Sequence, residues 1–208
     1  ALIGANDPVA HFLGRADRQS YVDDEWRLLG TVKDYGDYFL VKHDLENMPT
    51  LGANGFLIRR DILNKAQVDE KHFFHIDVNW DLINLGMKTY VVVKNDIIHD
   101  SGEGIVEFFA KRKRYMEDLY LRDLGNRRYL LYDKRRDQKR IIEYCLYAGT
   151  FIGPTIFAIK GFLKKRDLAW FLHPLVCFMF LLIYGFSVIN WQGWNYLGIV
   201  LRKLKLIA

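Results

Sequence analysis

Segment 51–99 combines the residue types from which polar sites are built: a carboxylate, a histidine and a glycine-rich turn. Asp77 stands where a helix is expected to begin, and His99 closes a β-branched strand. A carboxylate in this position can act as a general base or simply cap the helix, and the two roles are compatible. Gly52, Asn54 and Gly55 let the backbone come close to a ligand, although a plain tight turn needs glycine as well.

A second group of chemically capable residues is the run Lys111-Arg112-Lys113-Arg114-Tyr115. Cations at this spacing can neutralise a diphosphate, and the Tyr115 ring can stack on a sugar. Arg112 and Arg114 are the strongest candidates, because a guanidinium binds phosphate with two donors. A helix face turned to solvent or to lipid headgroups explains the same run equally well.

Hydrophobic periodicity predicts the elements that position these residues. In the helix that starts at Asp77, residues Val78, Leu82 and Leu85 share one face, and Gly86 ends the helix. The predicted elements are a strand at 56–58, a short helix from 61, a helix at 77–85, a strand at 90–93 and a helix at 105–120 that ends before Gly125-Asn126.

The formal net charge of +5 over 208 residues is unevenly distributed. Residues 1–104 have a balance of −6, residues 105–140 have +6, and the remaining residues have +5. The basic residues therefore form a collar beside the apolar C-terminal third, which suits anionic lipid headgroups. A nucleic-acid-binding protein would carry its cations on the folded domain, so the sequence argues against nucleic acid as a partner.

Two long apolar runs follow the basic collar. Residues 168–191 contain no charged side chain, and 24 positions are enough for a helix to cross a bilayer. Residues 141–163 are a weaker candidate for a membrane-crossing helix, because Glu143 and Lys160 lie among them. The pattern predicts a transmembrane hairpin, with an interfacial or re-entrant first helix as the alternative. The basic flanks favour the cytoplasmic face of the cell membrane for the folded part, whereas three positive charges in the loop 164–167 argue against this orientation.

The two cysteines, Cys145 and Cys177, both fall in the apolar runs and lack a metal-binding spacing. A disulfide framework is not expected, and the first residues do not read as a secretory signal. The chain opens on an apolar, strand-like stretch without an initiating Met, so we expect that an N-terminal portion is missing.

Four pieces of the sequence together resemble the C-terminal half of the family 2 inverting glycosyltransferases of the GT-A type. In order, they are GANGFLIRR at 52–60, HIDVNWDLINLG at 75–86, IIHDSG at 97–102 and KRKRY at 111–115. The resemblance implies an α/β fold, the C-terminal part of a Rossmann-like GT-A domain followed by two membrane-associated or transmembrane helices. It divides the chain into the acceptor-side part of the domain (1–125), a basic juxtamembrane segment (126–140), and a two-helix anchor with a basic tail (141–208).

The resemblance assigns Asp77 to the carboxylate that serves as the catalytic base in this family. An inverting transfer needs a carboxylate to take the proton from the acceptor hydroxyl. Ile76 departs from the pattern, because the family has a Glu at that position. If the acceptor is a polyprenyl phosphate, a strong base is unnecessary, and Asp77 would position the acceptor or a metal instead.

The other site residues are implied by the same resemblance. Gly52, Asn54 and Gly55 would pass close to the acceptor sugar, and His99 would reach the diphosphate of the donor or its metal. A lone histidine at a strand end is otherwise an ordinary packing or surface residue. The run 111–115 resembles the Gln-Arg-x-Arg-Trp motif of processive members, but Lys replaces Gln and Tyr replaces Trp, which weakens any expectation of processivity.

The expected activity is transfer of a sugar from a nucleotide-diphosphate donor to a lipid-linked or glycan acceptor, with inversion, at a membrane. The donor-binding half of the family, with its Asp-x-Asp, is not recognised in this sequence. The main ligands of the divalent metal, Mn²⁺ or Mg²⁺, are therefore expected in the missing N-terminal part, and this chain alone is expected to be inactive. The alternatives are a non-catalytic membrane-anchored interaction module and a degenerate glycosyltransferase that serves as a scaffold.

Overall fold

The computed structural model describes residues 8–15, 18–19, 26–51, 55–68, 73–95, 104–122 and 124–203. The chain divides into two compact units. The sheet unit comprises residues 10–102 and 126–133, and the helical unit comprises residues 1–9, 103–125 and 134–208. Each unit has its own buried side chains, such as Val41 and Ile83 in the sheet unit and Ala148 and Phe180 in the helical unit.

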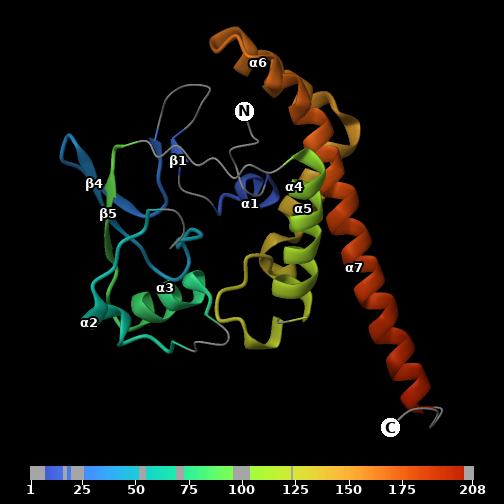
Figure 1. Cartoon of the computed structure of the whole chain (residues 1–208), viewed down its shortest axis with the longest axis horizontal. Helices are drawn as coiled ribbons and strands as arrows, with labels where there is room; N and C mark the ends of the chain where they lie inside the picture. The colour runs from blue at the N-terminus through green and yellow to red at the C-terminus, as the bar shows by residue number, and fades with distance from the viewer. Residues whose placement is uncertain are drawn as a thin grey trace. The chain divides into compact units, whose positions relative to one another are not determined.

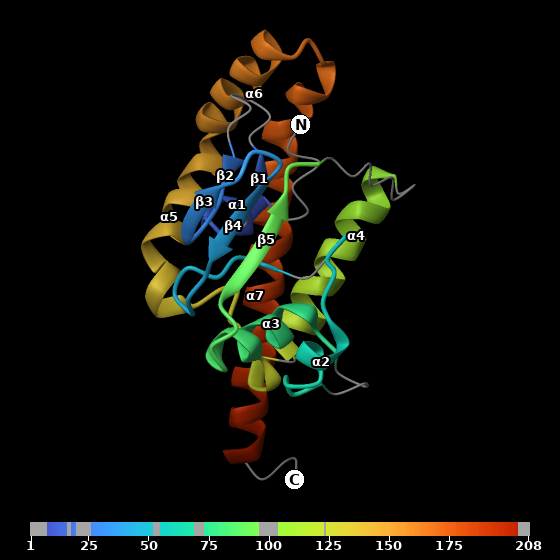
Figure 2. The ribbon, with the colours of Figure 1, turned by 90° about the vertical axis from the view of Figure 1, so that its left-hand side faces the viewer.

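The sheet unit is built on three antiparallel strands in the order β3-β4-β5 (Figure 2). Side chains alternate along β4, so that Phe39 and Val41 are buried whereas Tyr38 and Lys42 are exposed. Strands β1 and β2 form a separate antiparallel pair. The elements up to residue 93 are α1 (Pro8–Phe12), β1 (Arg18–Gln19), β2 (Trp26–Arg27), β3 (Thr31–Asp34), β4 (Tyr38–Lys42), α2 (Arg60–Leu63), α3 (His75–Asn84) and β5 (Thr89–Val93) (Figure 1).

The apolar face of helix α3 contributes to the core of the sheet unit. Val78 and Leu82 are buried, as the periodicity predicts, whereas Leu85 is 57% exposed because the helix ends at Asn84. Gly86 follows with a φ of 92°, a conformation that glycine adopts easily, and it ends the helix as predicted. The predicted short helix and the second predicted strand are also confirmed, as α2 and β5.

The strand predicted at 56–58 is wrong. These residues belong to neither sheet, and Leu57 is 93% exposed. An apolar run of three residues is too short to specify a strand, since strands are usually longer. Phe56 instead packs its ring near that of Tyr90, with 6.4 Å between the centroids.

The helical unit is organised around its last helix, α7, which contacts the other helices of the unit. The elements after residue 104 are α4 (Ile105–Tyr115), the π-helix η2 (Met116–Arg122), the 3₁₀ turn η3 (Leu124–Asn126), α5 (Lys134–Thr150), α6 (Ile152–Lys164), the 3₁₀ turn η4 (Leu168–Leu172) and α7 (His173–Lys203). The helix predicted at 105–120 is confirmed, because α4 continues directly into η2.

The chain bends by 74° between α5 and α6. Phe151 occupies the bend with a φ of 62°, a left-handed conformation that is unusual for a residue other than glycine. Helix α6 has 13 residues and is therefore about 20 Å long, shorter than the ~30 Å core of a bilayer. Within the described residues, the segment Leu168–Gly193 is long and apolar enough to cross a membrane by itself, whereas α5 and α6 qualify only as one bent pair.

The fold is therefore a mixture of helices and a small antiparallel sheet, with an apolar C-terminal helix that supports membrane association. The strands that the structure describes pair only in the antiparallel sense. Parallel strands are the basis of a Rossmann-like sheet. The assignment to a GT-A domain consequently stays a prediction.

Helix α6 packs closely on η4 at Gly161, so we expect this glycine to respond differently to alanine substitution than a glycine with open space around it. Trp170 is 2% exposed, and a Cβ at Gly161 would stand 2.5 Å from its ring. We expect Gly161→Ala to lower the free energy of unfolding of the helical unit by about 1–3 kcal/mol, because the ring has to move.

Gly185 on α7 is the matched control, since an added Cβ there meets no atom of the described residues within 4 Å. Gly185→Ala should raise stability by about 0.5–1 kcal/mol, because alanine loses less backbone freedom in a helix. Thermal unfolding in detergent compares the two variants. An equal shift for both would contradict the Trp170 contact as the cause.

Candidate functional site

Asp77 lies in the first turn of α3 and is only 3% exposed. The interpretation of Asp77 as the N-cap is wrong, because α3 begins at His75 and its N-cap is Phe74. Phe74 has an apolar side chain, so no side chain caps this end of the helix. The Asp77 carboxylate is turned instead toward residues about 50 positions further along the chain.

Segment 126–133, here called the strap, occupies both carboxylate oxygens of Asp77. The Arg127 guanidinium stands 3.3 Å from Oδ2, and the backbone N–H of Tyr129 donates to Oδ1 at 3.0 Å. Both side chains of the ion pair are buried, Arg127 to 6% exposure and Asp77 to 4%. The guanidinium also lies 3.8 Å from the centre of the Phe74 ring, a cation–π contact.

A second carboxylate on α3 binds the next residue of the strap. Arg128 Nε lies 2.7 Å from Asp81 Oδ1, and the backbone N–H of Gln67 donates to Asp81 Oδ2 at 3.1 Å. The phenolic O–H of Tyr129 donates to the Met48 carbonyl at 3.0 Å. Asp77 and Asp81, one helical turn apart, therefore bind the successive residues Arg127 and Arg128. The strap belongs to the sheet unit, as α3 does.

Sequence reasoning did not find the partners of Asp77, although their residue types were visible in the sequence. Arg127, Arg128 and Tyr129 were grouped with the basic juxtamembrane segment because they precede a run of further cations. The available signal was the spacing of Asp77 and Asp81, four positions apart in a helix, which matches a pair of adjacent cations. Spacing alone does not say which of the many arginines is bound.

The basic run 111–115 lies at the C-terminal end of α4 in the helical unit. Four of the five residues of this run fall into two groups. The Arg112 guanidinium lies over the rings of Tyr115, at 5.1 Å, and Phe108, at 5.7 Å. Lys113 and Arg114 are exposed, and they line a cavity of about 360 Å³ together with Glu107, Ala110 and Glu117.

The charges at this cavity are mixed. Lys113 Nζ lies 3.8 Å from Glu117 Oε1 on the next turn of the helix. An anion that enters the cavity would meet two cations and two carboxylates. Arg114 is therefore better placed for a phosphate group than Arg112, whose guanidinium is stacked on aromatic rings.

The predicted site residues fall in both units of the chain. Asp77 and Gly55, which has a φ of 79°, belong to the sheet unit, and the run 111–115 belongs to the helical unit. Gly52, Asn54 and His99 lie outside the described residues. No cluster of three or more His, Cys, Asp or Glu side chains that could hold a metal occurs in the part of the chain that the structure describes. The main ligands of the metal are expected outside this chain, so the metal stays a prediction.

Two histidines in the sheet unit are held in environments that disfavour their charge. Burial lowers the pKa of His75, although the negative charge of Asp77 opposes this effect. Burial also lowers the pKa of His43, which is 1% exposed and packs edge-on against the Tyr90 ring at 5.3 Å. Protonation of either ring therefore works against the folded state.

We expect the sheet unit to lose stability as the pH falls from about 7 to 5. The unfolded histidine binds a proton near pH ~6.5, whereas the buried His43 stays neutral below that pH, so acid favours the unfolded state by up to about 1.4 kcal/mol per unit of pKa depression. Urea midpoints between pH 7.5 and 5.5 measure the effect. His43→Leu should flatten this dependence, and an unchanged slope in that variant would refute the assignment.

The chain was compared with protein-family models, with curated proteins and with solved structures, and none of the three comparisons found a match. A functional assignment therefore rests on the sequence motifs and on the geometry of the described residues. The strap and the cavity on α4 are the two features of that geometry that bear on chemistry.

Proposed function

We propose that this chain is the acceptor-side part of a membrane-bound inverting glycosyltransferase of the GT-A type. The full protein would transfer a sugar from a nucleotide-diphosphate donor to a lipid-linked or glycan acceptor at the cytoplasmic face of the cell membrane. In this proposal, the sheet unit provides Asp77, and the helical unit provides the phosphate-binding cations and the membrane attachment.

The observation that carries the proposal is the position of Lys113 and Arg114. Both side chains line a cavity on α4, and α4 packs directly on the apolar helix α7 through Phe108 and Phe180, whose ring centroids are 5.8 Å apart. Cations next to a helix that is compatible with lipid are placed where a lipid-linked phosphate would lie. The order of the glycine turn, the acidic α3, the strand β5 and the basic α4 supports the same family.

Asp77 can serve this proposal in one of two ways. As a base, the carboxylate must be uncovered before it can meet the acceptor hydroxyl, because Asp77 is only 3% exposed and the strap contacts both of its oxygens. As a positioning residue, it keeps its contacts and holds the strap against α3. Only the first role makes the rate of transfer depend on the carboxylate itself.

The decisive assay uses the full-length protein in mild detergent with labelled sugar nucleotides, Mn²⁺ or Mg²⁺, and lipid-phosphate or glycan acceptors. Transfer with inversion is expected. Arg114→Gln should reduce transfer about 10- to 100-fold, because a hydrogen bond to a charged group is lost. Arg122→Gln is the matched control, since Arg122 is 65% exposed and is paired with Asp118 on the same helical stretch. Failure to bind or transfer any sugar nucleotide would refute the proposal.

The second candidate is a non-catalytic membrane-bound interaction module. The observation in its favour is that Asp77 and Asp81 are both engaged in holding the strap, as structural carboxylates are. This candidate predicts no nucleotide binding by the full-length protein, together with an intact fold.

A further inference from the structure

Helix α7 has two contrasting sides. The protein-facing stripe consists of residues that are at most 8% exposed: His173, Val176, Phe180, Tyr184 and Ser187. The outward stripe follows at steps of three and four residues, which places its members on one helix face: Leu175, Met179, Leu182, Phe186 and Ile189. Leu175 is 47% exposed, Phe186 61% and Ile189 65%, whereas Met179 and Leu182 are half-buried, so much of this apolar face is open.

The protein-facing stripe is packed against charged helical turns. The rings of Phe108 and Phe109 lie 5.8 and 6.0 Å from that of Phe180. Further along α7, the hydroxyl of Ser187 donates to Glu117 Oε1 at 3.3 Å. The middle of α7 is therefore attached to the segment that carries Lys111 to Arg114 and Glu117.

This packing is difficult to combine with a membrane crossing by α7. If residues 168–193 crossed the bilayer, Phe180 would lie near its middle, and α4 would be drawn to the same depth with its cations. Charged side chains at that depth are costly and are tolerated mainly when they line water or pair within a bundle. If α7 lies along the membrane surface, the outward stripe enters the lipid, and the charged helix stays on the aqueous side.

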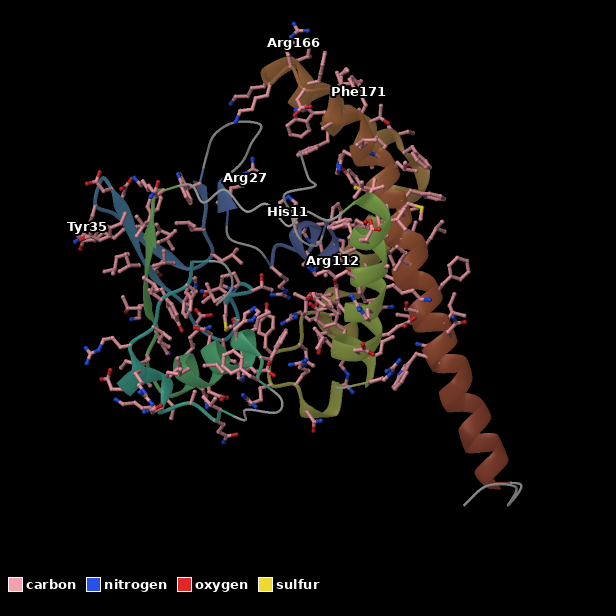
Figure 3. All side chains as sticks on the ribbon, in the orientation of Figure 1. His11, Arg27, Tyr35, Arg112, Arg166 and Phe171 are labelled. Carbon is pink, nitrogen blue, oxygen red and sulfur yellow. The ribbon has the colours of Figure 1, made fainter. Side chains whose placement is uncertain are left out.

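The C-terminal end of α6 carries the positive charge that a helix lying on an anionic membrane surface needs. Lys164, Lys165 and Arg166 are all exposed, and Figure 3 shows Arg166 pointing outward at this end of the helix. Asp167 follows them, but its carboxylate accepts a hydrogen bond from the Ala169 N–H and caps η4. A second exposed stripe runs along α6 and consists of Ile152, Ile156, Ile159 and Leu163. Cations beside exposed apolar stripes match a membrane with anionic headgroups.

We propose that the helical unit is monotopic, so that α7 lies in one leaflet of an anionic membrane and does not cross it. The outward stripe of α7 enters that leaflet, and Lys164 to Arg166 bind its headgroups. The inference deepens the membrane attachment in the proposed function and rests on it. The positive charge of Lys164 to Arg166 favours an anionic lipid leaflet over a second copy of this chain. A second copy would bring the same cations to the interface, where they would repel.

Cysteine labelling tests this topology in the full-length protein in sealed membrane vesicles. In a Cys145→Ser background, in which the remaining Cys177 is 1% exposed, one added cysteine replaces Lys33 in the sheet unit, Arg166 at the end of α6, or the exposed Gln192 on α7. The background without an added cysteine gives the blank. A membrane-impermeant maleimide is expected to label all three from the same side. Labelling of Gln192→Cys only from the side opposite to Lys33→Cys would show a crossing and overturn the proposal. The readout does not depend on transfer, so an inactive protein can still pass the test.

Flotation tests whether an anionic lipid leaflet binds the outward stripe. It uses phosphatidylcholine vesicles with and without about 30% phosphatidylglycerol. Phe186→Glu should weaken partitioning about tenfold or more, whereas Gln138→Glu on α5, which adds the same charge at an exposed position, should not. Replacing Lys164, Lys165 and Arg166 by Gln should remove the preference for anionic vesicles. The same change at Lys33, Lys42 and Lys65, which are exposed lysines of the sheet unit, should leave most of it. The proposal would be overturned if each variant and its control changed vesicle binding equally. It would also be overturned if the outward stripe held a dimer together and did not bind lipid.

Discussion

Arg127→Ala is expected to lower the free energy of unfolding of the sheet unit by about 3–5 kcal/mol. The substitution leaves the Asp77 carboxylate, whose side chain is 4% exposed, buried without its cation. It also removes the cation that lies on the Phe74 ring. Urea unfolding followed by hydrogen exchange of the α3 amides measures the loss in the sheet unit specifically.

The control for Arg127→Ala is Arg122→Ala, which breaks a shorter ion pair, of 2.8 Å, with Asp118. Its partners are 65% and 44% exposed, so the expected loss is at most about 1 kcal/mol. The double variant Asp77→Asn/Arg127→Met should recover much of the loss, because it removes both charges and keeps an acceptor for the Tyr129 N–H. A loss as small as that of the control would mean that the strap does not depend on this ion pair.

Under the proposed function, with Asp77 as the base, Asp77→Asn in the full-length protein is expected to reduce the rate of transfer by about 10²–10⁴-fold, the usual contribution of a general base. Asn is nearly isosteric and can still accept the hydrogen bond from the Tyr129 N–H, but it cannot take a proton from the acceptor. The structure adds that Arg127 then loses its counter-charge, so some destabilisation accompanies the change. Rates therefore have to be divided by the folded fraction, which is measured on the same samples.

Asp81→Asn is the matched control for this prediction. Asp81 is on the same helix, one turn later, and is paired with Arg128 in the same strap. If Asp77 is the base, Asp81→Asn keeps transfer within a few-fold once folding is corrected, whereas Asp77→Asn does not. Equal, fold-corrected losses in both variants would assign Asp77 a positioning role, and near-normal transfer would remove it from the mechanism.

Local signals in the sequence predicted a large part of the fold. The period of Val78 and Leu82, followed by Gly86, located α3 and its end, and the β-branched residues before Lys94 located β5. These elements were predictable because their signals lie within one helical turn or one strand. The predicted strand at 56–58 failed for the same reason, since three apolar residues do not distinguish a strand from a loop that packs one ring.

The site was predictable only as a set of residue types. Asp77 was recognised as a carboxylate with a special place in the chain, but its burial and its contacts with Arg127 and Tyr129 depend on residues about 50 positions away. In the basic run 111–115, the sequence ranked Arg112 and Arg114 equally. The structure separates them, because Arg112 is stacked on Tyr115 and Arg114 lines the cavity.

The sequence alone determined where charge and apolar residues concentrate: an acidic first half, a basic middle and an apolar last third. Those properties follow from composition and need no fold. Tertiary structure decided which charges are neutralised inside the protein and which stay available outside. It bound Arg127 and Arg128 to α3, left Arg114 exposed, and turned one side of α7 toward charged helical turns. The reason is physical: pairing, burial and depth in a membrane depend on distances between residues that are far apart in the sequence.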